Sequence, residues 1–151
     1  MTSFPPIEEL LPHADGMLLI DRIVGAHDKT VQSETTVRAD NIFYRQGHGL
    51  PAYVGFELMA QTISAYDGLR RHANGEKPVM GFLLGCRKYE TARPFFAEGE
   101  TLRIEATSLL GDEGMASFEC RIAGADGTQL ASAVINVYRP ADPHAFLQAQ
   151  T

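Results

Sequence analysis

Few polar side chains interrupt the apolar stretch from Tyr53 to Tyr66, and three of them share one helical face. Glu57, Gln61 and Ser64 occupy positions i, i+4 and i+7, so a helix places them in one narrow line. A helix that is apolar almost all round must be covered by protein on most sides. The pattern therefore predicts a carboxyl group in a largely buried environment, where it can take part in acid–base chemistry.

Two interpretations of Glu57 follow, because an unpaired buried charge is too costly to keep for packing alone. In the first, Glu57 is structural, and a neighbouring arginine or backbone amides satisfy it. In the second, it is a catalytic carboxyl. The elements that surround the helix decide between the two.

The composition is that of a globular protein with an acidic balance. The chain has 151 residues, of which 44% are hydrophobic and 21% charged, and its formal net charge is −6. This length predicts one domain, residues 1–151, with a core over about residues 7–138 and a tail over residues 139–151. An acidic chain lacks the basic surface that nucleic acid requires. No run approaches the ~18 apolar residues of a membrane span and no signal-peptide pattern is present, so we expect a cytoplasmic protein.

Residue periodicity predicts one long helix and about six strands. The helix is expected to run to about His72, before the stop signal Asn74-Gly75. Within residues 101–109 and 115–122 apolar and polar residues alternate, so one face of the sheet is expected to be covered and the other wet. The expected strands are residues 17–24, 30–39, 79–89, 101–109, 115–122 and 129–138.

One long apolar helix without a second helix layer can be hidden only if the sheet curls around it. The sequence therefore predicts an α+β fold of the hotdog type, with an antiparallel sheet around the central helix. A single sheet leaves part of the helix and one sheet edge open. We expect at least a dimer, formed either by two copies of the chain or with another hotdog subunit.

Two strings resemble the hotdog 3-hydroxyacyl-(acyl-carrier-protein) dehydratases: Leu11-Pro12-His13 through Asp21-Arg22, and Pro51 through Gln61. Glu57 falls on the family's acidic residue. The likeness covers roughly residues 7–138 and is strongest to the divergent dehydratases of aryl-polyene biosynthesis. It implies dehydration of a 3-hydroxyacyl thioester on an acyl carrier protein to the trans-2-enoyl thioester, in fatty-acid-like or aryl-polyene biosynthesis.

The histidine of this family is the point where the sequence departs from the pattern. The common dehydratases carry it in a Gly-His-Phe-Pro loop before the glutamate. The nearest candidate, His48, lies only nine residues before Glu57, and an alignment without a gap puts Phe43 on the histidine position. Either the loop is shortened and His48 still reaches the site, or the base is His13, in a segment that lines the tunnel mouth in related proteins. We favour His13.

The resemblance assigns chemistry to these residues. A neutral imidazole suits removal of the C2 proton. A carboxyl that burial keeps protonated suits protonation of the departing C3 hydroxyl, which is the role expected of Glu57. This reaction needs no metal and no bound organic cofactor.

Three further residues are expected to bind substrate. The first-turn amides around Val54 and Gly55 are expected to lack an intrahelical acceptor and to bind the thioester carbonyl. Gly55 would let that carbonyl approach the backbone. Gln61 lies on the same polar line as Glu57 and is expected to contact the substrate.

Two rival functions use the same residues. A hotdog acyl thioesterase would direct water at the thioester with the same acid. A non-catalytic subunit would complete a heterodimer with a dehydratase. The assay product separates them: an enoyl thioester, a free acid, or nothing until a partner is added.

Acyl carrier proteins are acidic, so docking on a chain of net charge −6 must be local. The expected docking patch consists of Arg87, Lys88 and Arg93, which cluster around one strand and the following turn. The alternative is that these cations are solvated or paired with Glu90 and Glu98.

Overall fold

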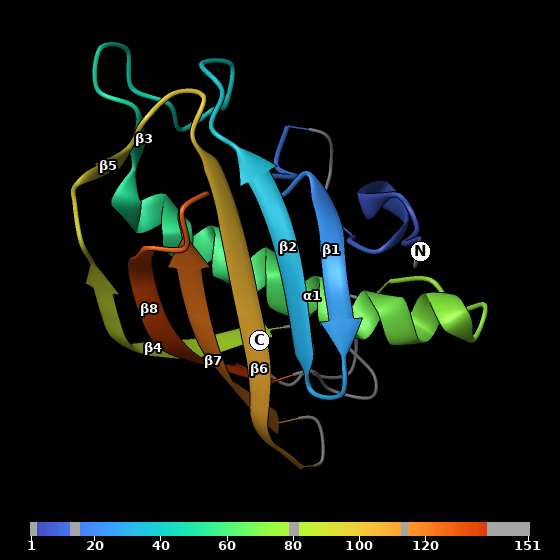
Figure 1. Ribbon diagram of the computed structural model, residues 1–151. Coiled ribbons are helices and arrows are strands. Elements are labelled where there is room, and N and C mark those ends of the chain that lie inside the picture. Colours follow the sequence, from blue (N-terminus) through green and yellow to red (C-terminus); the bar gives the residue numbers. More distant parts are fainter. Residues whose placement is uncertain (1–2, 13–15, 79–81, 113–114, 139–151) are drawn as a thin grey trace, which may run out of the picture.

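The computed structural model describes residues 3–12, 16–78, 82–112 and 115–138, and it consists of one curved sheet and one long helix (Figure 1). The sheet is antiparallel and six-stranded, with the order β1-β2-β6-β7-β8-β4. The helix α1 (Gly55–Ala73) lies against its concave face. The strands are β1 (Arg22–His27), β2 (Thr30–Thr36), β4 (Phe82–Thr91), β6 (Thr101–Asp112), β7 (Met115–Ala123) and β8 (Gln129–Tyr138).

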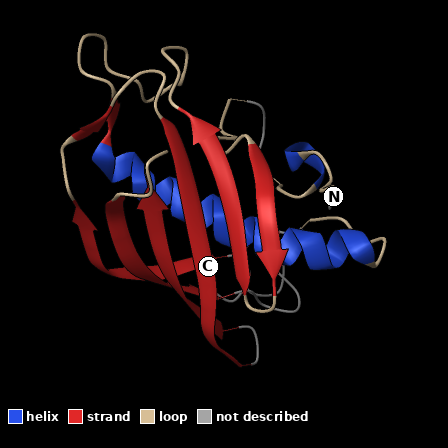
Figure 2. Ribbon diagram, viewed as in Figure 1, coloured by secondary structure: helices blue, strands red, loops and turns tan. Residues whose placement is uncertain are grey.

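The remaining elements are short. Two of them, β3 (Leu50–Pro51) and β5 (Phe95–Phe96), pair with each other beside the start of α1. The 3₁₀ turn η2 (Ala52–Val54) leads directly into α1, and η1 (Ile7–Glu9) lies near the chain start. Figure 2 shows α1 on one face of the sheet, and in the described part of the chain no helix covers the other face. This arrangement is the predicted hotdog fold.

The alternation of residues along the strands explains which face is covered. In β6, Leu102, Ile104 and Ala106 are buried toward the helix, whereas Arg103 and Glu105 lie on the opposite face. The prediction of one covered and one wet face is therefore confirmed. Burial of one apolar face of a sheet against a helix is the main stabilising contribution in such a fold.

The first strand is shorter than predicted. The sequence predicted a strand over residues 17–24, but β1 begins at Arg22. The backbone of Leu19 is bonded to side chains instead of a strand: its N–H donates to Oε1 of Gln61 (2.8 Å), and its carbonyl accepts from the Thr35 hydroxyl (2.9 Å). Side chains of the helix and of β2 have therefore replaced ladder hydrogen bonds here.

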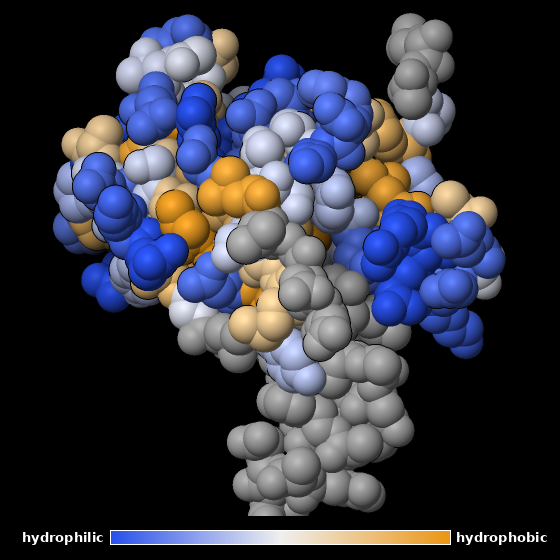
Figure 3. Space-filling view, turned by 90° about the horizontal axis from the view of Figure 1, so that it is seen from below, coloured by the Kyte–Doolittle hydropathy of each residue, from blue (hydrophilic) through white to orange (hydrophobic). Residues whose placement is uncertain are grey.

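The sheet has two open edges. The strands β1 and β4 are first and last in the strand order, so each has one edge without a partner strand among the described residues. The face seen in Figure 3 carries apolar side chains near its middle and hydrophilic side chains toward both ends. An open edge is a common site of pairing with another chain.

Within the described ranges, no helix is both long and apolar enough to span a membrane.

Candidate active site

Glu57 lies in the first turn of α1, where the sequence predicted it. Its side chain is half-buried, and Oε1 accepts a hydrogen bond of 3.3 Å from Nε2 of Gln61, one helical turn further on. The carboxyl is thus less enclosed than the apolar sequence around it suggested. Partial exposure leaves it within reach of a ligand.

Gln61 is fully buried and makes two further hydrogen bonds to a distant segment. Its Oε1 accepts from the N–H of Leu19 (2.8 Å), and its Nε2 also donates to the carbonyl of Met17 (2.7 Å). The amide therefore connects Glu57 with the backbone of residues 17–19. A direct contact between Gln61 and substrate, as expected from the sequence, does not fit this burial.

The next residue of the helix is held in a similar way. The Thr62 hydroxyl lies 2.7 Å from the hydroxyl of Ser33 on β2 and donates to the carbonyl of Leu58 (2.8 Å). Thr62 and Ser33 are both fully buried. Buried hydroxyls in mutual contact satisfy each other, so this pair fixes the helix against the sheet without any charge.

At the start of the helix, carbonyl groups of the preceding turn accept hydrogen bonds. The N–H of Gly55 donates to the carbonyls of Ala52 and Tyr53, so the expectation that this amide lacks an acceptor is wrong. The cause is η2, whose 3₁₀ turn supplies nearby acceptors that an isolated helix start would lack. Val54 is buried at the position before the helix.

A residue that the sequence reasoning missed lies at this helix start. The hydroxyl of Tyr89, from β4, donates to the carbonyl of Ala52. Burial raises the pKa of Tyr89 to about 12, aided by the nearby Cys86, while a hydrogen bond from the Phe56 backbone acts in the opposite direction. The hydroxyl is therefore a permanent donor near neutral pH.

The structure describes Glu57 and only one of the two histidines predicted as its partner base. His13 lies outside the described residues. His48 is exposed in the loop before β3, and its ring stacks on Phe95 with 5.3 Å between ring centroids. Among the described contacts none joins His48 to Glu57. Phe43, the ungapped counterpart of the family histidine, is half-buried and packs against the core.

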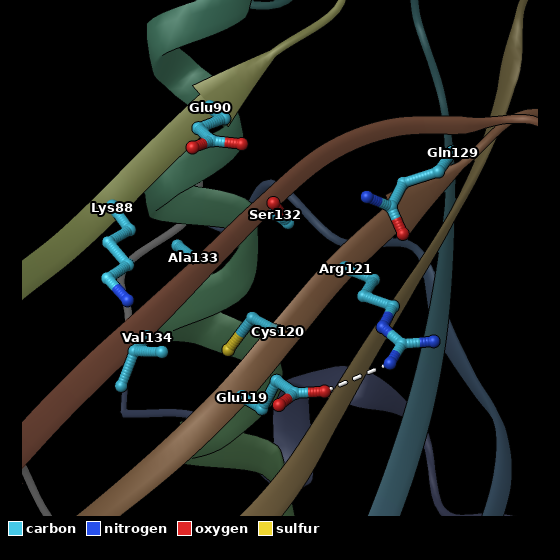
Figure 4. A pocket seen from close by; sticks show the side chains of 9 residues that line it. All are labelled: Lys88, Glu90, Glu119, Cys120, Arg121, Gln129, Ser132, Ala133 and Val134. Atoms are coloured by element: carbon cyan, nitrogen blue, oxygen red, sulfur yellow. Dashed lines mark hydrogen bonds and ion pairs between the residues drawn. The ribbon is translucent and has the colours of Figure 1, made fainter.

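The predicted docking cations differ in their surroundings. Arg93 forms an ion pair with Glu100, rather than with Glu90 or Glu98. Arg87 and Lys88 are exposed on β4. Figure 4 shows Lys88 beside a hollow on the outer face of the sheet, where Glu119 and Arg121 of β7 pair with each other.

The two cysteines are free thiols in the sheet. Cys120 is buried, and burial raises its pKa to about 12. Burial also raises the pKa of the half-buried Cys86. Both groups are therefore protonated near neutral pH and behave as small apolar side chains.

Comparison with known proteins connects this geometry to a family. The family model of the ApeP-like proteins, described as ApeP dehydratase, matches residues 5–148. A curated relative, the 3-hydroxyacyl-(acyl-carrier-protein) dehydratase FabZ of Pseudothermotoga lettingae, is 32% identical over 135 residues, which are 87% of this chain and 91% of the relative.

Solved structures agree with the family match. A chain of the dehydratase heterocomplex ApeI:P from Xenorhabdus doucetiae is 32% identical, with a TM-score of 0.90 and 99% of each chain covered. A thioesterase from Haemophilus influenzae has a TM-score of 0.63 at 12% identity, over 83% of this chain and 82% of the other. At that identity the likeness is one of fold alone.

Proposed function

Because this chain belongs to the ApeP-like dehydratase family, we propose that it converts a 3-hydroxyacyl thioester on an acyl carrier protein to the trans-2-enoyl thioester. The relative FabZ is named for a reaction of this class. The observation that carries the proposal is the half-buried carboxyl of Glu57 in the first turn of α1, held by a neutral amide. Fatty-acid-like or aryl-polyene biosynthesis and a cytoplasmic location are part of the same proposal.

In this reaction Glu57 supplies the proton that leaves with the C3 hydroxyl. A base removes the C2 proton, the C3–O bond breaks, a C2=C3 double bond forms, and the hydroxyl departs as water. His13 is the proposed base, and His48 is the alternative. The Val54 amide stays in the proposal as a donor to the thioester carbonyl, whereas that of Gly55 already has acceptors.

Gln61 is proposed as a positioning residue and not as a substrate contact. Its Nε2 bonds both Glu57 and the carbonyl of Met17, so the carboxyl is oriented relative to residues 17–19. Those residues follow His13 closely in the chain. One buried amide can therefore set the geometry between the acid and the segment that carries the proposed base.

Partners are the second part of the proposal. The likeness to a chain of a dehydratase heterocomplex supports a second hotdog subunit as a partner, and the open edge of β4 offers a place to pair. A homodimer would use the same edge. The carrier protein is proposed to dock at Arg87 and Lys88, whereas Arg93 is engaged with Glu100.

The decisive experiment is Glu57→Gln in the purified protein, assayed with a 3-hydroxyacyl carrier substrate. The amide keeps the size of the side chain but cannot supply a proton, so we expect turnover to fall by about 10²–10⁴-fold with the fold intact. Glu105→Gln is the matched control, because Glu105 also accepts from a glutamine amide, Gln32 (2.8 Å), but on the outer face of the sheet. Near wild-type turnover of Glu57→Gln would remove Glu57 from the reaction.

The product of the wild-type protein decides between the functions. An enoyl thioester supports dehydration, and a free acid would make the chain a thioesterase. If a product forms only when a second hotdog subunit is added, the chain acts as part of a heterodimer. The same assay on Glu57→Gln with that subunit present then shows which subunit supplies the acid.

A further inference from the structure

The strand β4 contains a bulge where it passes the start of the catalytic helix. Its pairing with β8 is regular from Gly85 to Arg87, which faces Val134, and resumes at Glu90, which faces Ser132. Lys88 and Tyr89 lie between these pairs, and Lys88 has a φ of 57°. A left-handed backbone is unusual for lysine and costs roughly 1–2 kcal/mol. Such a bulge bends the strand and redirects its side chains.

The bulge determines to which face of the sheet Lys88 and Tyr89 point. Lys88 points to the outer face, where it borders the hollow shown in Figure 4. Tyr89 points inward, packs against the core, and reaches the turn η2 across 37 residues of sequence. Without the extra residue, strict alternation from the outward-facing Arg87 would point Lys88 inward and Tyr89 outward.

The hydroxyl of Tyr89 fits tightly against the first residue of α1. A Cβ atom at Gly55 would lie 2.4 Å from the Tyr89 hydroxyl, so the lack of a side chain at Gly55 is what admits this oxygen. The hydroxyl donates to the Ala52 carbonyl, and the N–H of Ala52 donates to the carbonyl of Pro94 (2.8 Å). The position before α1 has no side-chain cap of its own. The residues around the end of β4 therefore hold the helix start.

We propose that Tyr89 is a positioning residue for the dehydration. Its hydroxyl fixes η2, and η2 sets the place and direction of the first turn of α1. Glu57 follows two residues after Gly55, so the acid is located by this contact. This inference rests on the proposed function, because Tyr89 affects turnover through the position of Glu57. Small displacements of a catalytic group lower turnover more than they lower binding.

Tyr89→Phe tests the inference, because it removes only the hydroxyl and keeps the ring. We expect kcat to fall by about tenfold, since the acid is displaced, while KM stays within about twofold. Tyr44→Phe is the control: the Tyr44 hydroxyl also donates, to Glu98 (3.2 Å), but at an exposed site. A kcat of Tyr89→Phe within twofold of the control would overturn the inference, as would a rise in KM with unchanged kcat.

A double-mutant cycle keeps the test meaningful if Tyr89→Phe lowers stability. Gly55→Ala in the wild-type protein forces a methyl group against the Tyr89 hydroxyl, whereas in Tyr89→Phe that oxygen is absent. We therefore expect Gly55→Ala to lower kcat several-fold less in the Tyr89→Phe background than in the wild type. Additive losses would show that the two groups do not act together, and would overturn the inference.

Failure of this inference can be told from failure of the proposed function. If Glu57→Gln is inactive and Tyr89→Phe is fully active, the acid stands and only the positioning role is lost. If Glu57→Gln is active, the role of Glu57 is lost. In that case hydrogen exchange of the Phe56 and Glu57 amides still tests whether Tyr89 fixes the start of α1. Faster exchange in Tyr89→Phe supports it, and unchanged exchange overturns it.

Discussion

The two ends of α1 are held by different kinds of interaction. At the first half, the neutral side chains of Tyr89, Gln61 and Thr62 make the contacts that fix the helix. At the last half, the carboxylate of Asp67 pairs with Arg70 and Arg71, each at 2.8 Å. The charged residues lie one turn apart on the same helix, whereas the neutral partners come from other elements.

This difference matches the roles of the two ends, because only the first half of α1 carries the proposed acid. Ion pairs between residues one turn apart stabilise a helix locally, and water and salt weaken them without consequence for a site. A neutral amide beside Glu57 orients the carboxyl through a hydrogen bond and is itself uncharged. The half of the helix that carries the proposed acid is therefore also the half in which long-range neutral contacts set the geometry.

The largest effect is expected from the base that works with this first half. His13→Ala should lower kcat by about 10²–10⁴-fold, the usual contribution of a general base, and His48→Ala should lower it less. The physical reason is that His13 closely precedes the segment bonded to Gln61, whereas His48 is exposed and stacked on Phe95. Comparing kcat of the two purified variants is the measurement. The reverse order would assign the base to the loop before β3.

Removal of the central amide should affect activity and stability together. Gln61→Leu leaves the buried N–H of Leu19 and the partly buried carbonyl of Met17 without their partner, so we expect the free energy of unfolding to fall by roughly 1–3 kcal/mol. We also expect kcat to fall, because Glu57 loses its orientation. Chemical denaturation and steady-state kinetics measure the two effects. Gln32→Leu, on the outer face of the sheet, is the control and should change stability by less than about 1 kcal/mol.

A change at the other end should separate stability from activity. Asp67 is buried, with 6% exposure, and Asp67→Asn weakens its pairs with Arg70 and Arg71. We expect the free energy of unfolding to fall by about 1–2 kcal/mol and kcat to stay within twofold. The same denaturation and kinetic assays apply. A large loss of kcat here would contradict the division of α1 into a functional and a supporting half.

Local patterns made most of the fold predictable from the sequence. The helix and the alternating strands depend on periodicities of 3.6 and 2 residues, which neighbouring residues display directly. Glu57 could be identified for the same reason, because it is a rare polar residue on an apolar helix. The early start predicted for β1 failed because Leu19 bonds to the side chains of Gln61 and Thr35, which lie far away in the sequence.

Contacts between distant segments limited the prediction of the site. The inward turn of Tyr89 depends on the left-handed backbone of Lys88, and lysine is not a residue type that marks such a position. Gln61 was assigned to substrate because its two distant partners, Leu19 and Met17, could not be seen in its spacing. Arg93 pairs with Glu100 because the turn after β4 folds back, which the sequence order alone did not indicate.

The smallest effect is expected on the outer side of the β4 bulge, where the carrier protein is proposed to dock. Reversing the charges of Arg87 and Lys88 to glutamate should raise KM for carrier-bound substrate by about fivefold at low salt. Exposed cations mainly speed the encounter with an acidic partner. The rise should fade as salt increases, because screening shortens the reach of these charges.

The control for this change lies at the opposite end of α1, which the comparison predicts to be remote from the site. Lys77→Glu reverses one exposed charge there and should leave KM within about twofold. A short pantetheine substrate should not distinguish any of these variants, because it lacks the acidic carrier. If the Arg87 and Lys88 variant lost equally on both substrates, the bulge would support the helix start through Tyr89, and the carrier would dock elsewhere.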